Sequence, residues 1–214
     1  MILEKIRKLF SHQGVYKFSR WKEPIAPVVF GVNDISLAEM KNAFSEVVSL
    51  SHNSLFDVDP NLGSNFMIFF CSNWKELYGV PNLEKLITNL ADLVKSLEAT
   101  KSNQYRSFRF SSDGSIRLCV VLIKYDSKLA AVSVQTLATN QMLQSILLWS
   151  PEAFKEESPI AYANKNNYCF VKPFYSALIK AAYDRVLPDV SYDSNHALRL
   201  MARVNLLMES EDGA

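Results

Sequence analysis

Three side-chain amides interrupt a long stretch of this sequence that carries no charge. Positions 129–151 contain no Asp, Glu, Lys or Arg, but Asn140, Gln141 and Gln144 stand among their apolar residues. Asn140 and Gln144 are four residues apart, so on a helix they share one face. Gln141 falls in an apolar sector, where a polar side chain needs a hydrogen-bond partner. We expect these amides either to bind a ligand or to hold the helix against nearby strands and loops.

The same run has the shape of the zinc-protease motif His-Glu-x-x-His, with an amide at each functional position. That motif needs two histidines to bind zinc and a glutamate to act as the base. Amides are poor zinc ligands and cannot act as a base. The run is therefore structural, or it is a metalloprotease-like layout that has lost its chemistry. A hydrolase of unrecognised type, with a polar pocket near Asn140 and Gln144, remains an alternative function.

The last predicted helix carries a second candidate site for a ligand. His196, Arg199 and Arg203 are spaced by three and four residues, so they form one cationic stripe on a helix. A stripe of this kind binds a carboxylate or a phosphate when it faces a cleft. The other interpretation is a solvated face that pairs with local acids such as Asp189 or Asp193.

Other patterns of catalytic or metal-binding residues are absent from the sequence. The three histidines, His12, His52 and His196, are far apart, and none lies at ligand spacing from a cysteine. Six glycines leave little room for a phosphate loop or a dinucleotide fingerprint. Cys71 and Cys119 fall in predicted central strands, where a thiol is usually an inert apolar group. We expect no catalytic residue, no metal site and no cofactor.

A buried helix must position the amides. Ser133 is the expected N-cap, and helix-favouring residues continue to Trp149, shortly before Pro151. Apolar side chains surround most of this helix, which is typical of a core helix or a membrane span. Its polar residues favour the core, because unpaired amides are costly in hydrocarbon.

Two strands are predicted at the centre of a mixed sheet. The runs 66–71 and 118–123 are apolar without alternation, as expected for strands covered on both faces. Asp113 and Gly114 predict a tight turn in a hairpin over 105–125. The resulting register pairs Arg109 with Leu118 and Phe110 with Arg117.

That register bears on three arginines in the hairpin. Arg109 falls on the opposite face from Arg106 and Arg117, and the latter two lie far apart along the strands. We therefore interpret the three as a solvated rim and not as a nucleic-acid patch.

The remaining predicted elements complete a single domain. We expect helices at 36–51, opened by a capping box of Ser36 and Glu39, and at 73–79, 83–101, 173–183 and 195–208. A helical turn is expected from Ser150, and a polar loop at 156–167. Further strands are expected at 15–18, 25–30, 55–58 and 168–171. Residues 1–12 form an amphipathic helix, 13–208 the α+β domain, and 209–214 an acidic, frayed tail.

The first helix has a short apolar stripe beside basic residues. We expect it to pack on its own domain or on a partner, so that removal of residues 1–10 leaves a folded domain. Membrane contact is not expected, although a membrane-associated accessory protein stays as a second alternative function.

Composition limits the classes of protein to which the chain can belong. With 214 residues and a net charge of +1, it has the size of one domain and no overall field that favours nucleic acid. Its three separated cysteines fit a reducing compartment. The N-terminus shows no secretory signal. These features predict a cytoplasmic protein.

Three segments resemble parts of an uncharacterised family of bacterial proteins. They are Arg20–Ile25, Ile146–Phe154 and His196–Leu200. The resemblance covers most of the chain after the first helix and implies no activity, cofactor or catalytic residue. More loosely, the chain resembles bacterial domains in which a His-Glu-x-x-His-type helix packs against a sheet, without the zinc ligands.

The sequence thus predicts one α+β domain, with a mixed sheet that contains a central hairpin and packs against a buried, charge-free helix and several amphipathic helices. The preferred function is a non-enzymatic bacterial binding or protein-interaction domain. Its expected partner is another protein or a small anionic ligand, not nucleic acid. The oligomeric state does not follow from the sequence.

Overall fold

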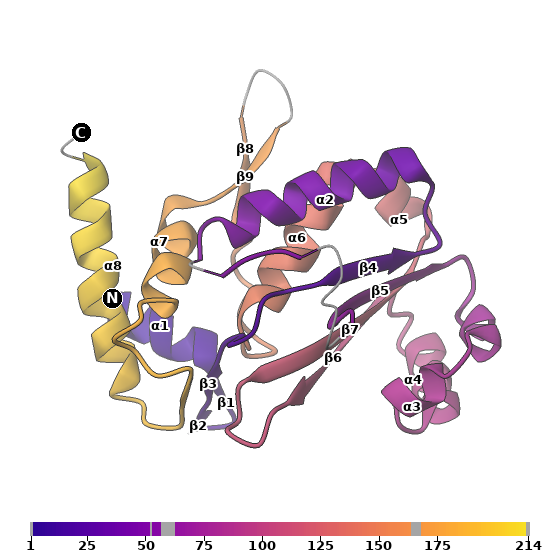
Figure 1. The fold of residues 1–214 in the computed structure, drawn as a ribbon, viewed down its shortest axis with the longest axis horizontal. Helices are drawn as coiled ribbons and strands as arrows, with labels where there is room; N and C mark the ends of the chain where they lie inside the picture. The colour runs from indigo at the N-terminus through magenta and orange to yellow at the C-terminus, as the bar shows by residue number, and fades with distance from the viewer. Residues whose placement is uncertain (1, 52, 57–62, 164–167, 213–214) are drawn as a thin grey trace.

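A computed structural model describes residues 2–51, 53–56, 63–163 and 168–212 of the chain. A four-stranded sheet runs through the molecule with helices on both faces, and the first and last helices gather at one end (Figure 1). The chain is a single α+β domain with a mixed sheet, which confirms the predicted fold class.

The sheet has the strand order β4-β5-β7-β6. Its strands are β4 (Pro27–Phe30), β5 (Phe66–Cys71), β6 (Gln104–Phe110) and β7 (Ile116–Lys124). β5 pairs in parallel with both β4 and β7, and β6 pairs antiparallel with β7. The two predicted central strands are therefore adjacent at the centre, and β4 is an edge strand that begins at its proline, as Pro24 and Pro27 allow.

The central strands are buried on both faces because a layer of helices covers each. On one face Phe66, Ile68 and Val121 join the main core with α2 (Asp34–Val48) and α6 (Val134–Ile146). On the other, Phe69 and Leu122 pack with a 3-10 helix, η1 (Trp74–Gly79), and with α3 (Leu83–Leu86) and α4 (Leu90–Ala99). Figure 1 shows the two layers on opposite sides of the sheet.

The hairpin has the predicted register up to a β-bulge. Arg109 lies opposite Leu118 as expected, but Phe110 lies opposite Ile116 instead of Arg117, because the register shifts between Arg109 and Phe110. At the turn, Asp113 Oδ1 accepts hydrogen bonds from the Ser115 N–H at 3.0 Å and from its hydroxyl at 2.6 Å. The spacing in the sequence contains no signal for this extra residue.

Two predicted helix features are wrong. The N-cap of α2 is Asn33, whose side chain accepts from the Ser36 N–H at 2.8 Å, so Ser36 and Glu39 form no capping box. Glu39 instead accepts from the Gln135 N–H at 3.2 Å. The helix predicted over 83–101 is divided into α3 and α4, because Asn89 adopts a left-handed conformation with φ of 57°.

Several element boundaries also differ from prediction. Residues 150–154 form turns without a helix, and the predicted polar loop contains β8 (Ile160–Tyr162), which pairs with β9 (Cys169–Val171). Of the strand predicted at 55–58, Leu55 makes a single bridge to Ile25, and positions 57–58 lie outside the described residues. The remaining elements are α5 (Ser127–Ala130), α7 (Pro173–Ala182), β1 (Ser11–His12), β2 (Val15–Tyr16), β3 (Phe18–Ser19) and β10 (Val190–Ser191).

The first and last helices belong to the domain. In α1 (Ile2–Phe10), Ile6, Leu9 and Phe10 are at most 3% exposed and lie in the main core. The Phe10 ring stacks on Trp149 with 5.3 Å between ring centroids. This burial removes the basis for expecting residues 1–10 to be dispensable. The last helix, α8 (His196–Asp212), continues through most of the tail that was predicted to fray.

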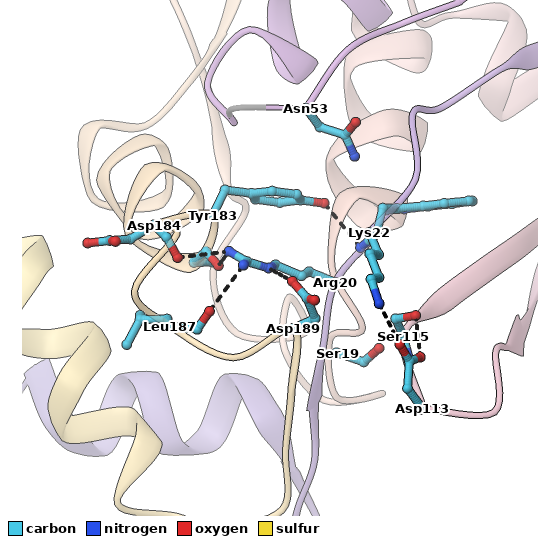
Figure 2. Close-up of polar contacts among 12 residues, drawn as sticks. Ser19, Arg20, Lys22, Asn53, Asp113, Ser115, Tyr183, Asp184, Leu187 and Asp189 are labelled. Carbon is cyan, nitrogen blue, oxygen red and sulfur yellow. Dashed lines mark hydrogen bonds and ion pairs between the residues drawn. The ribbon is translucent and has the colours of Figure 1, made fainter.

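Hydrogen bonds from Arg20 hold the connector before α8 against the N-terminal part of the chain. Figure 2 shows its guanidinium beside the Tyr183 ring, with carbonyl and carboxylate oxygens around it. Arg20 is 7% exposed. It donates to Asp189 Oδ1 at 2.7 Å and to the carbonyls of Ala182, Asp184 and Leu187 at 2.5, 3.2 and 3.1 Å. The acid therefore neutralises this buried charge inside the fold.

Side chains satisfy the last carbonyls of α6 and end the helix at Ile146, three residues before the predicted end. The Trp21 and Trp149 indole N–H groups donate to the carbonyls of Ser145 and Leu143 at 2.7 and 2.8 Å. The Tyr183 hydroxyl donates to the Ile146 carbonyl at 2.7 Å. Because these partners replace the next helical turn, the chain can leave the helix and pair with the segment at Ser19 and Arg20.

Within the described residues, no helix is both long and apolar enough to cross a membrane.

Candidate functional site

The end of α6 presents its amides to strand β6. Ser133 begins the helix as predicted, since its side chain accepts from the Thr136 N–H at 3.1 Å. Gln141 is 1% exposed, whereas Asn140 and Gln144 are partly buried. Asn140 and Gln144 lie side by side, as their spacing of four residues predicts, and Gln141, predicted in an apolar sector, also reaches β6.

Arg106 of β6 is the partner of these amides. Its Nη2 donates to Gln141 Oε1 at 2.6 Å, and its Nη1 donates to Gln144 Oε1 at 2.7 Å. Its Nε donates to the Ser145 hydroxyl at 3.0 Å. The interpretation of Arg106 as part of a solvated rim is therefore wrong, because its guanidinium is hydrogen-bonded to side chains of helix α6.

The network extends by amide-to-amide hydrogen bonds. Gln141 Nε2 donates to Gln104 Oε1 at 2.8 Å, and Gln144 Nε2 donates to Asn140 Oδ1 at 3.4 Å. A guanidinium donates and never accepts, so both glutamines must turn their oxygens towards Arg106. This requirement fixes the orientation of every amide in the chain of contacts.

The charge of Arg106 is surrounded by neutral groups, namely three oxygens and the Cys119 thiol. Burial lowers the pKa of its guanidinium, but an arginine stays protonated at neutral pH. Among the described residues no carboxylate forms an ion pair with it, in contrast to Arg20 and its partner Asp189. Three of the five N–H groups of the guanidinium donate to oxygen, so two have no oxygen acceptor in the described part of the chain, where the Cys119 thiol is a further neighbour.

Arg106 lines an open groove of about 800 Å³. This size falls within the range of ligand-binding clefts. Aromatic and basic side chains dominate its walls, and no Asp or Glu is among the described residues that line it. The lining residues are Phe10, His12, Val15, Lys17, Arg106, Ser107, Phe108, Phe110, Gln144, Leu148, Trp149, Ser150, Pro151, Phe154 and Lys155.

Two lysines add to the positive character of the groove. Lys17 Nζ lies 4.2 Å from the centroid of the Phe110 ring, a cation–π contact that leaves its charge unneutralised. Lys155 forms an exposed ion pair with Glu152 at 2.8 Å, so its charge is largely compensated. The net field in the groove therefore comes from Arg106 and Lys17.

A thiol near the network is chemically quiet. Cys119 Sγ lies 3.7 Å from the Ser145 hydroxyl, and burial raises the pKa of this thiol to about 11. It is therefore neutral at physiological pH and is not a nucleophile. Cys71 and Cys169 are also buried and free.

The second predicted site, His196, Arg199 and Arg203, does not lie in the groove. Its three side chains also do not form one cationic stripe. His196 is 3% exposed and packs edge-on against the Phe18 ring at 4.3 Å. Burial, followed by the charge of Arg199, lowers the pKa of His196 to about 4, so the ring is neutral. Arg199 is exposed, and Arg203 Nε pairs with Asp184, a different acid from those expected.

The sequence held one signal for the missed residue. Gln141 required a buried partner, and Arg106 was placed on the face opposite Arg109 by the hairpin register. Arg109 does lie on the other side, where its Nη2 donates to the Lys85 and Leu86 carbonyls at 2.6 and 2.8 Å. What the sequence could not supply was that α6 lies over β6 at Arg106.

In the described part of the chain, no group of three or more His, Cys, Asp or Glu side chains is placed to hold a metal ion. Comparison with protein-family models, curated proteins and solved structures yields no match to this chain. The resemblance of three segments to an uncharacterised bacterial family therefore stays a sequence-based expectation. In the fold the first two of these segments are adjacent, since Arg20 forms a bridge to Leu147, and His196 packs against Phe18, two residues before the first segment.

Proposed function

We propose that the chain is a non-enzymatic binding protein of the bacterial cytoplasm that holds an anionic group of its ligand against Arg106. The observation that carries this proposal is a partly buried guanidinium without a carboxylate partner in the described residues. Taking a charge out of water is costly, and folds usually offset that cost with an opposite charge. Here a ligand would supply the opposite charge.

The chemistry of the groove suits an anion attached to an apolar or aromatic group. Phe108, Phe110 and Phe154 offer apolar surface beside the two uncompensated cations. Charge-assisted hydrogen bonds from the N–H groups of Arg106 that have no oxygen acceptor would orient a carboxylate or a phosphate. The amides Gln141 and Gln144 then act as positioning residues, because they hold the guanidinium rather than the ligand.

The hydrolase alternative gains no support from these contacts. Gln141 and Gln144 are engaged with Arg106, and amides cannot act as a base. Among the groove-lining residues, Ser107 and Ser150 make no hydrogen bond to His12 that would form a nucleophile and base pair. The membrane alternative is weakened too, since the apolar side of α1 is buried in the core.

The test compares an aromatic carboxylate with its neutral isostere. Phenylacetate should bind, and phenylacetamide should bind at least tenfold more weakly, when both are titrated into the protein by calorimetry. Arg106→Gln should weaken phenylacetate binding at least tenfold. Arg117→Gln is the matched control, because it removes the same charge from an exposed position outside the groove. Equal binding of the two probes, or equal effects of the two substitutions, would refute the proposal.

A further inference from the structure

We propose that the groove takes an extended acidic peptide, which pairs its main chain with the free edge of β6 and places a carboxylate on Arg106. This inference rests on the proposed function, because it names the ligand class of the same groove. It adds a mode of binding that small anions do not use, namely addition of a strand to a sheet.

The register of the hairpin identifies which main-chain groups of β6 are free. β6 is the last strand of the sheet. The Lys124 N–H donates to the Asn103 carbonyl at 2.9 Å, and Gln104 lies opposite Ile123. Because hydrogen-bonded pairs alternate along an antiparallel ladder, the N–H and C=O groups of Arg106 and Phe108 point away from β7. No other strand or loop of the described residues bonds to them.

The two edges of the sheet are unequal. β4 spans four residues and begins with Pro27, which has no N–H to offer, and natural sheets protect their edges in this way. β6 spans seven residues and contains no proline. Its bulge between Arg109 and Phe110 ends regular pairing at the far end of the groove, next to the lining residue Phe110, but leaves Arg106 to Phe108 as ordinary strand. The unprotected edge is therefore the one that borders the groove.

The groove and the edge share residues. Arg106, Ser107 and Phe108 line the groove as well as forming the strand. A chain laid along β6 at the usual interstrand distance of about 4.8 Å would enter the groove with alternate side chains on the Arg106 face. An acidic side chain there would meet the guanidinium, and an apolar one would meet Phe108.

The positive charge of the groove favours an acidic peptide as the ligand, and the free main-chain groups of β6 favour a peptide over a nucleic acid. The described lining offers cations and no carboxylate, so acidic side chains are complementary to it. The net charge of the whole chain is only +1, and the groove has two uncompensated cations, few for a phosphate backbone. Free strand N–H and C=O groups pair with another peptide backbone, which a phosphodiester chain cannot imitate.

The experiment is a selection followed by a main-chain scan. A phage-displayed library of random ten-residue peptides is selected on the wild-type protein, on Arg106→Gln and on Arg117→Gln. Wild type and Arg117→Gln should enrich peptides with an acidic residue flanked at alternate positions by apolar ones. These peptides should bind Arg106→Gln at least tenfold more weakly.

The best peptide is then made with N-methyl groups on one alternate set of its amides, or on the other. Strand pairing predicts that methylation of the set facing β6 weakens binding at least tenfold, while methylation of the other set does not. On binding, the Arg106 and Phe108 N–H groups should also become protected against hydrogen exchange. Tolerance of both methylated sets, or no gain in protection, would overturn strand addition.

Other outcomes separate this inference from the proposed function. If phenylacetate binding depends on Arg106 but no acidic peptide is enriched, the inference fails and the proposed function stands; if neither probe binds, both fail. If a ten-residue oligothymidylate displaces the bound peptide at a concentration lower than that of unlabelled peptide needed for the same displacement, the preferred ligand is a nucleic acid and the inference fails. If Arg106→Gln self-associates and no peptide binds to wild type, the role of Arg106 is to prevent pairing between β6 edges of two molecules. That outcome would overturn the inference.

Discussion

At the scale of single residues, the two inward-facing arginines define what the fold needs and what it leaves available. Arg20 donates hydrogen bonds to one carboxylate and three carbonyls, so its charge is neutralised within the protein. Arg106 has three neutral acceptors and borders an open groove. The sequence drew attention to the amides of this site, because a buried glutamine needs a partner, but gave no reason to choose Arg106 as that partner.

Gln141 should be the amide on which stability depends most. Replacing it with Met keeps the volume but leaves Arg106 and Gln104 each without one partner. We expect Gln141→Met to lower the free energy of unfolding by about 1–3 kcal/mol. Asn140→Ala should cost less, because Asn140 is partly exposed and makes one long contact to Gln144. Urea unfolding of both variants checks this, and a more stable Gln141→Met protein would argue that the amide serves a ligand directly.

His196 should make stability dependent on pH below neutrality. In the fold its pKa is lowered to about 4, whereas in the unfolded chain it is about 6.5. Between these pH values the unfolded chain binds more protons. The contribution of neutral His196 to the free energy of unfolding is therefore fully present above pH 6.5, falls as the pH drops, and is lost below about pH 4. The whole loss is about 3 kcal/mol at most.

The matched variant for this effect is His196→Phe, which keeps an aromatic ring against Phe18 but does not titrate. Urea unfolding at pH 7 and pH 4.5 should show a larger loss of stability in wild type than in His196→Phe. Equal losses in the two proteins would mean that other groups cause the acid sensitivity.

At the scale of elements, boundaries were harder to predict than identities. The central helix begins at its predicted cap, but it ends at Ile146 because Trp21, Trp149 and Tyr183 satisfy its last carbonyls. These side chains come from distant parts of the chain, and local signals such as Pro151 cannot anticipate them. The division of the predicted helix 83–101 at Asn89 has a local cause, a left-handed residue, that the apolar periodicity concealed.

The first helix should be indispensable for the fold. Phe10 is 1% exposed and stacks on Trp149. We expect Phe10→Ala to cost about 3–5 kcal/mol, because it opens a cavity in the main core. Ile2→Ala, at a side chain that is 36% exposed, should change stability by no more than about 0.5 kcal/mol. Thermal unfolding of the two variants compares them. Near-equal melting temperatures would show that α1 is an appendage, as the sequence suggested.

At the scale of the whole molecule, the architecture followed from patterns that are local, whereas the groove did not. Two unbroken apolar runs and an Asp-Gly turn were enough to predict the centre of a mixed sheet. The groove instead combines the β1–β2 hairpin, strand β6 and the chain after α6. These segments are far apart in the sequence, and no periodicity relates them. Folding brings Arg106 to the groove, which is why the sequence predicted the amides but not their charged partner.

The central claim, that Arg106 keeps its charge for a ligand, can be tested within a single protein sample. In ¹⁵N-edited spectra that resolve arginine side chains, phenylacetate is added and the Nε–H signals of Arg106 and Arg20 are followed together. We expect the Arg106 signal to shift with a saturable dependence on phenylacetate, while the signal of Arg20, which already pairs with Asp189, stays in place. An unchanged Arg106 signal at saturating phenylacetate, or equal shifts of both arginines, would contradict an anion site at Arg106.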